Sequence, residues 1–234
     1  MDRITRKNLK DDKFAAEVTH SVEYIAGHRR QATLYGGIGV AVLAVALGIF
    51  LYWQHRQNAA HQGLYKALET HHALISEDDR PGRVTYKTEE QKTARALVQF
   101  SELARNYPRS TEGRMARYYI GVIQFEMGKT AEAQKQLEQV IGEGQDSILA
   151  LARLSLAEVY VAQGKHDEAG KIYDYLLKQP TDTVSESRVK LAMVRHLQSR
   201  NKPEEARKLL MELLKTPGVV AAAAGNMLRE LPQQ

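Results

Sequence analysis

"EMGKTAEA", at Glu126–Ala133, is a short polar turn that the chain repeats twice at a nearly constant interval. The second copy is "AQGKHDEA" at Ala162–Ala169, and the third is "SRNKPEEA" at Ser199–Ala206. Each copy has Gly or Asn followed by Lys, and each ends on Ala. Gly and Asn tolerate the left-handed backbone conformation that ends a helix. The repeated turn therefore predicts three helical hairpins.

The residues on both sides of the turns are in register as well. A large and a small apolar residue precede each turn, at Ile120–Gly121, Leu156–Ala157 and Met193–Val194. After the turns come Ala133, Ala169 and Ala206, and four residues later Leu137, Tyr173 and Leu210. An earlier half-unit, "ARALVQFSELARNYP", contains Ala96, Phe100 and Pro108. Small residues let paired helices approach, and one hairpin cannot bury both of its faces, so the copies should stack into a solenoid.

This pattern resembles the tetratricopeptide repeat, whose period is about 34 residues. The spacing here is 36 and then 37 residues, and the resemblance covers residues 92–216. It implies an all-α fold with a right-handed α-solenoid. The sequence departs from the family in two ways. Basic residues stand where the family often has a large aromatic, at Arg117, Arg153 and Lys190, and the closing Pro is clear only as Pro108.

Leu34–Trp53, "LYGGIGVAVLAVALGIFLYW", is a stretch of twenty residues without a charged side chain. A helix of that length spans roughly 30 Å, the thickness of the hydrocarbon layer of a bilayer. Tyr35 at one end, and Tyr52 and Trp53 at the other, suit the headgroup region. The apolar run is too long for a signal peptide, and thirty-three residues precede it. We expect a single retained transmembrane helix in contact with lipid.

The basic residues on either side of this helix predict its orientation. Residues 1–33 contain seven Lys and Arg, whereas only Arg56 and Lys66 follow the helix closely. Basic segments tend to stay in the cytoplasm. The N-terminus should therefore be cytoplasmic, and residues 54–234 should be exported.

Small residues at Gly37 and Ala41, and again at Ala44 and Gly48, are spaced as in close helix–helix contacts within membranes. They indicate either a homo-oligomer that forms through the transmembrane helix or simply the usual abundance of Gly and Ala in such helices.

The sequence divides into five segments. Residues 1–33 form a tail in which Phe14, Val18, Val22 and Ile25 predict an amphipathic helix. This helix either lies on the inner leaflet, meets a cytoplasmic partner or simply extends the span. The other segments are the transmembrane helix (34–53), a connecting helix and polar loop (54–91), the repeats (92–216) and a C-terminal capping helix (217–234).

Charge and residue types argue against several functions. Beyond the tail, 26 basic and 23 acidic side chains remain, which is no footprint for nucleic acid. The chain has no Cys. His71 and His72 are adjacent and point about 100° apart on a helix, so they do not chelate one metal ion. No phosphate loop, nucleophile elbow or catalytic triad is visible. We expect no catalytic, cofactor or metal residues, and no enzyme.

A solenoid of this kind offers a concave groove, lined by the first helix of each hairpin, to partner proteins. In the family register, the residues that face it are Tyr118, Val122, Leu154, Glu158, Leu191 and Arg195. Tyr and Arg are common anchors of binding surfaces. The basic column, defined as Arg117, Arg153 and Lys190, either adds a stripe for acidic segments or packs between helices.

The order of tail, span and exported helical repeats resembles the YfgM-type family of bacterial inner-membrane proteins. Gly48–Trp53, with the pattern G-x-x-x-Y-W, followed by a helix rich in Gln and Ala, is the local likeness. The resemblance implies an ancillary Sec translocon subunit whose periplasmic domain binds the translocon, periplasmic chaperones or exported clients. Two other classes stay open: a scaffold of the cell envelope, and a structural subunit of a membrane protein complex.

Overall fold

The computed structural model describes residues 29–76, 84–143 and 148–231. The chain divides into two compact units at the boundary between Asn58 and Ala59. The amphipathic helix expected between Phe14 and Ile25 lies outside the described residues.

The first described element is α2 (Arg29–His71), an uninterrupted helix of 43 residues. Its large apolar side chains from Leu34 to Trp53 are all more than half exposed. Within the described residues, α2 alone is long and apolar enough to cross a membrane. Such a surface is unfavourable in water and favourable in hydrocarbon. The helix does not end at Trp53, so the predicted connecting helix continues it without a break.

A small sheet follows α2. β1 (Leu74–Ile75) and β2 (Thr85–Tyr86) pair in parallel, with Leu74 opposite Thr85. The sequence predicted the end of the connecting helix and a polar loop here, and not this sheet, because strands of two residues show no alternation. Thr88 then caps the next helix, since its hydroxyl accepts a hydrogen bond from the Gln91 amide at 3.2 Å.

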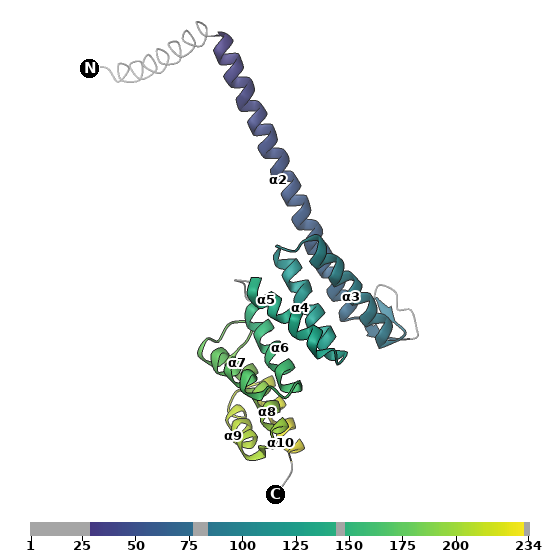
Figure 1. Ribbon diagram of the computed structural model, residues 1–234, viewed down its shortest axis with the longest axis vertical. Helices are drawn as coiled ribbons and strands as arrows, with labels where there is room; N and C mark the ends of the chain where they lie inside the picture. Colours follow the sequence, from purple (N-terminus) through teal and green to yellow (C-terminus); the bar gives the residue numbers. More distant parts are fainter. Residues whose placement is uncertain (1–28, 77–83, 144–147, 232–234) are drawn as a thin grey trace, which may run out of the picture. The chain divides into compact units, whose positions relative to one another are not determined.

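The rest of the described chain is helical (Figure 1). The helices are α3 (Glu89–Asn106), α4 (Thr111–Glu126), α5 (Thr130–Glu143), α6 (Ile148–Ala162), α7 (His166–Lys178), α8 (Glu186–Ser199), α9 (Pro203–Leu213) and α10 (Val219–Glu230). The pairs α4–α5, α6–α7 and α8–α9 are the three predicted hairpins. Each helix packs against the next, and the first helices of the hairpins also contact one another, α4 with α6 and α6 with α8. The predicted all-α, tetratricopeptide-like solenoid is confirmed.

The repeated turn has the same hydrogen bonds in all three copies. In the first copy, the Lys129 amide donates to the Gln124 carbonyl at 2.8 Å, and the Gly128 amide donates to the Phe125 carbonyl at 2.9 Å. This pair of bonds defines a Schellman motif and requires a left-handed residue at the end of the helix. In the three turns the residues with positive φ are Gly128 (76°), Gly164 (74°) and Asn201 (54°). Gly or Asn recurs in the turn because these residues adopt the left-handed backbone conformation readily.

The core consists of overlapping clusters, each shared by three consecutive helices. One joins α4, α5 and α6, the next joins α6, α7 and α8, and the last joins α8, α9 and α10. The first cluster joins residues 60–67 of α2 to α3 and α4. The small residues after the turns are fully buried at these contacts: Ala133, Ala169 and Ala206. Each repeat is thus stabilised mainly by its neighbours, as in other solenoids.

Candidate functional site: a pocket across the first helices

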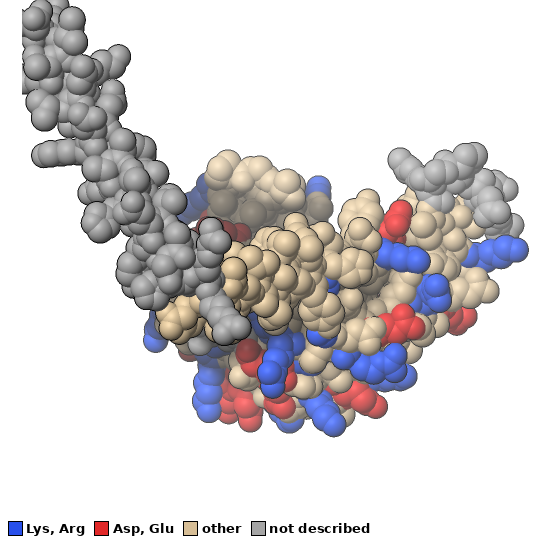
Figure 2. All heavy atoms as spheres, turned by 90° about the horizontal axis from the view of Figure 1, so that it is seen from above, with Lys and Arg blue, Asp and Glu red and all other residues tan. Residues whose placement is uncertain are grey.

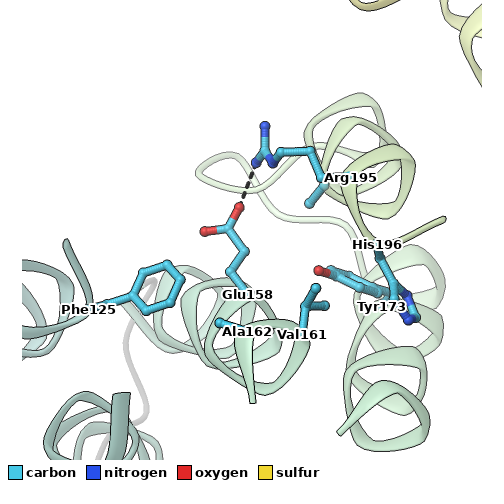
Figure 3. A pocket seen from close by; sticks show the side chains of 8 residues that line it. Phe125, Glu158, Val161, Ala162, Tyr173, Arg195 and His196 are labelled. Carbon is cyan, nitrogen blue, oxygen red and sulfur yellow. Dashed lines mark hydrogen bonds and ion pairs between the residues drawn. The ribbon is translucent and has the colours of Figure 1, made fainter. Parts of the chain in front are cut away.

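A pocket of about 440 Å³ lies along the layer of first helices (Figure 3). We call it the groove pocket. Its lining residues are Phe125 of α4, Glu158, Val161 and Ala162 of α6, Tyr173 of α7, and Ala192, Arg195 and His196 of α8. The pocket therefore draws on all three hairpins.

Helical spacing explains why these side chains share one surface. On α6, Glu158, Val161 and Ala162 stand at positions i, i+3 and i+4, which fall on one side of a helix. The residues of α8 that line the pocket have the same spacing. Phe125 and Ala162 lie 37 residues apart, at equivalent places in consecutive repeats. The pocket consequently follows the repeat direction.

An ion pair crosses the groove pocket from α6 to α8. A guanidinium nitrogen of Arg195 lies 2.6 Å from a carboxylate oxygen of Glu158 (Figure 3). The two side chains are 58% and 30% exposed, so solvent screens the pair and limits its contribution to stability to about 1 kcal/mol or less. The main consequence is local: the two charges cancel, and the remaining lining is largely apolar.

Aromatic rings form one wall of the groove pocket. The Tyr173 side chain is only 1% exposed, and its ring centroid lies 5.6 Å from that of His196. On its other side, His196 stacks on His166 at 5.3 Å. Burial lowers the pKa of His196, and the nearby His166 lowers it further. Burial also raises the pKa of Tyr173, with a smaller effect of Glu158. Both groups are therefore uncharged at neutral pH.

Of the residues expected in the groove, Glu158 and Arg195 line the pocket. Tyr118 and Leu154 are buried between helices, and the Tyr118 hydroxyl lies 3.5 Å from Ser155 on the neighbouring repeat. Val122 and Leu191 are half-buried against adjacent clusters. These four side chains pack between repeats and do not line the pocket. The sequence pattern does not separate the two positions, because a first helix packs on two sides and an apolar residue on either side gives the same signal.

The basic column is not part of the groove pocket. Arg117 pairs with Glu143 of α5, and Lys190 pairs with Glu212 of α9 as well as with Glu186. The Arg153 guanidinium lies 4.7 Å from the centroid of the Tyr175 ring on α7. Each member thus contacts the second helix of its own hairpin. Of the two readings of the column, the structure favours packing between helices over a free stripe for acidic segments.

Six residues that line the groove pocket were not predicted from the sequence: Phe125, Val161, Ala162, Tyr173, Ala192 and His196. Phe125, Val161 and Ala162 lie about one helical turn closer to the repeated turn than the predicted residues of their helices. A signal that could have found Phe125 and Ala162 is their spacing of 37 residues, which equals the spacing between Glu158 and Arg195. The sequence predicts Tyr173 only as a packing residue, and nothing in it shows that the hydroxyl reaches the pocket.

The described surface shows neither a cluster of metal-ligating side chains nor a continuous patch of one charge on the face in view. No group of three or more His, Cys, Asp or Glu that could hold a metal ion occurs within residues 29–76, 84–143 and 148–231. On the face shown in Figure 2, Lys and Arg side chains lie beside Asp and Glu, and neither sign forms a continuous patch. Recognition on this surface must therefore rely on local contacts more than on a long-range field.

Stacked helical hairpins with a pocket along their first helices define a class of helical-repeat proteins that bind other proteins. The chain matches the tetratricopeptide repeat-like domain family over residues 30–208, and it belongs to that family. Domains of this kind are typically non-catalytic scaffolds for protein–protein interaction.

The structure is also similar to solved structures of repeat proteins. One is a putative kinesin light chain from Podosopora anserina with nearly identical TPR-like repeats, at 16% identity and a TM-score of 0.45. The match covers 61% of this chain and 83% of that chain. A point variant of the same protein matches at 17% identity and a TM-score of 0.44, covering 60% and 70%. A comparison with curated proteins gives no match.

Proposed function

We propose that the protein is a membrane-anchored interaction module that faces the periplasm and assists translocon-linked export or periplasmic chaperone networks. The observation that carries the proposal is the groove pocket, which spans three hairpins and combines an apolar lining with a neutralised ion pair. Such a surface suits weak, adaptable contacts with polypeptide segments. A partner segment that is unfolded loses conformational entropy on docking, and its affinity should be modest.

The apolar part of α2 supports the membrane anchor. Its exposed side chains from Leu34 to Trp53 match the thickness of a bilayer, and the basic tail favours a cytoplasmic N-terminus. The repeats would then lie in the periplasm of a bacterium, anchored in the inner membrane by a single span. The resemblance to the YfgM-type family points to the same arrangement and to the translocon as a neighbour.

Affinity capture of the tagged full chain after mild detergent extraction tests the proposal. Ala162 is exposed and lines the groove pocket. In an Ala162→Arg variant the new side chain should therefore fill the pocket without disturbing the core. Ala222 is exposed on α10, away from the pocket, and Ala222→Arg makes the matched control. We expect translocon subunits or periplasmic chaperones with the unmodified protein and with the control, and several-fold less of them with Ala162→Arg.

Two other outcomes would contradict the proposal and identify its replacement. Capture of envelope assembly or division machinery instead of translocon and chaperones would make the protein a scaffold of another system. A complex of fixed stoichiometry that survives Ala162→Arg unchanged would make it a structural subunit of a membrane assembly.

A further inference from the structure

Tyr173 places a hydroxyl group at the wall of the groove pocket. Its ring is buried in the cluster shared by α6, α7 and α8, and its oxygen points toward Val161 and Glu158 (Figure 3). The hydroxyl makes no hydrogen bond to any residue within the described ranges 29–76, 84–143 and 148–231. Buried Tyr hydroxyls usually have a partner. A hydroxyl held at a pocket by a fixed ring, without such a partner, is suited to a ligand.

The protonation states around Tyr173 make its hydroxyl a donor. Burial and the nearby carboxylate of Glu158 raise the pKa of the phenol above its usual value, so it keeps its proton at neutral pH. A protonated phenol donates one hydrogen bond and also accepts. The carboxylate of Glu158 is held by Arg195 across the pocket. The Tyr173 hydroxyl is thus available to an acceptor that a bound ligand supplies.

The charge and size of the pocket restrict what can enter. The charges of Glu158 and Arg195 cancel, and burial keeps His196 uncharged by lowering its pKa. A charged side chain would lose its hydration without gaining an unpaired partner. The volume of about 440 Å³ lies toward the lower end of the range for ligand pockets, about 300–1,000 Å³. It suits one large side chain together with its flanking peptide groups.

We infer that the groove pocket binds one large uncharged side chain, aromatic or leucine-like, from an extended polypeptide, and that Tyr173 donates a hydrogen bond to the peptide carbonyl beside it. A polypeptide meets both requirements, because its main chain carries a carbonyl at every residue and needs partners when it is buried. The inference rests on the proposed function and specifies the chemistry of the partner.

Fluorescence anisotropy with defined peptides tests the inference on the full chain in detergent. The probes are labelled peptides of Gly and Ser that differ only in a central Phe, Leu, Ala or Asp. We expect the Phe and Leu peptides to bind about tenfold or more tightly than the Ala peptide, because they bury more apolar surface. The Asp peptide should bind no better than the Ala peptide.

Tyr173→Phe removes only the hydroxyl and keeps the ring in place. It should weaken the Phe peptide about three- to tenfold, the effect of one net hydrogen bond, while circular dichroism shows an unchanged helical fold. Tyr175→Phe, on the same helix but outside the groove pocket, is the matched control and should change nothing. If Tyr173→Phe does not fold, Ala162→Arg compared with Ala222→Arg still tests whether the Phe peptide occupies the pocket: only Ala162→Arg should weaken its binding, and equal binding to both variants would overturn the inference.

Three results would overturn the inference: no binding of the Phe peptide up to about 1 mM, equal binding of the Phe and Ala peptides, or equal effects of the two Tyr variants. These results are distinguishable from a failure of the proposed function. Defined peptides report on the pocket alone, whereas the affinity capture reports on the cellular partner. A pocket that binds the Phe peptide in a protein that captures no translocon or chaperone would separate the two.

Discussion

The guanidinium of Arg195 on α8 lies 2.6 Å from the carboxylate of Glu158 on α6, across the groove pocket. The two residues stand 37 positions apart, which is the spacing of the repeat itself. The pair therefore joins equivalent sites of consecutive hairpins. It removes the net charge from the pocket, and it links the first helices of two repeats.

Reversing one charge of this pair should destabilise the contact between the two repeats slightly. In a Glu158→Arg variant, two guanidinium groups face each other, and we expect the free energy of unfolding to fall by about 0.5–1 kcal/mol, since both groups are partly exposed. The double variant Glu158→Arg with Arg195→Glu should recover most of that loss. Chemical denaturation followed by circular dichroism measures both, and a double variant no more stable than the single one would show that the two side chains do not interact.

Arg117 should matter for folding rather than for binding. Its side chain is about 10% exposed and pairs with Glu143 on the second helix of the same hairpin. Arg117→Ala removes this pair and the packing of the aliphatic stem, so we expect a loss of about 1–3 kcal/mol in unfolding free energy. Arg117→Met keeps the stem and should lose less. If peptide affinity fell while stability stayed unchanged, the basic column would be a binding surface after all.

Ala169 is fully buried in the cluster shared by α6, α7 and α8. Ala169→Leu should overpack this contact and reduce the free energy of unfolding by about 1–3 kcal/mol. The neighbouring Gly170 is the matched control, because a Cβ there meets no atom within 4 Å. Gly170→Ala should stabilise the helix by about 0.5–1 kcal/mol. Unchanged thermal unfolding of Ala169→Leu would mean that the repeats are packed in a different register.

The hairpins could be predicted from the sequence because their signals are local. A left-handed residue at Gly128, Gly164 and Asn201 and a buried Ala five residues later follow from the short-range geometry of a helical turn. The spacing of these residue types along the sequence is enough to identify the hairpins. No three-dimensional information is needed to see that the unit recurs.

The groove pocket could be predicted only in part, because it depends on how repeats pack against each other. Leu154 and Val161 are both apolar residues of α6, yet Leu154 is buried between helices and Val161 lines the pocket. Both residues fit the same helical spacing of apolar side chains, so hydrophobic periodicity does not distinguish them. The choice between them follows from how neighbouring hairpins pack against each other, which a local pattern does not encode. That the hydroxyl of Tyr173 has no hydrogen-bond partner among the described residues likewise depends on contacts between α6, α7 and α8.

Stability should depend on pH through His196. Burial gives it a folded-state pKa below the ordinary 6.5, so the unfolded chain takes up a proton at a higher pH than the folded chain does. The contribution of the neutral ring is present above about pH 6.5 and is lost as the pH falls below it. His166, Arg200 and Lys202 oppose protonation, whereas Asp167 favours it. Acid should therefore weaken the contact between α7 and α8.

The measurement is the difference in unfolding free energy between the unmodified protein and His196→Phe, taken from pH 7.5 downward. This range includes the ordinary His pKa of about 6.5. The Phe ring can stack on His166 and Tyr173 but cannot take up a proton, so the variant should lose less stability in acid. His55→Gln, at an exposed position of α2, should follow the unmodified protein. Parallel curves for His196→Phe and the unmodified protein would exclude His196 as the source of acid sensitivity.

The orientation of the membrane helix can be tested through the charges of the tail. A reporter enzyme that is active only after export, fused after Gln234, should be active with the unmodified chain. The variant that should reduce this activity has Gln in place of five tail bases and Lys in place of three residues after the span. The five bases are Arg3, Arg6, Lys7, Lys10 and Lys13, and the three residues are Gln54, Gln57 and Asn58.

A control with neutral residues in place of the five tail acids separates the effect of basic residues from that of net charge. The acids are Asp2, Asp11, Asp12, Glu17 and Glu23. Orientation follows the distribution of Lys and Arg near the span, and acidic residues contribute little. The control should therefore leave the reporter active, although it changes the net charge of the tail by five, the same number as the removed bases. An inactive reporter on the unmodified chain would place the repeats in the cytoplasm, where periplasmic chaperones and exported clients could not reach the groove pocket.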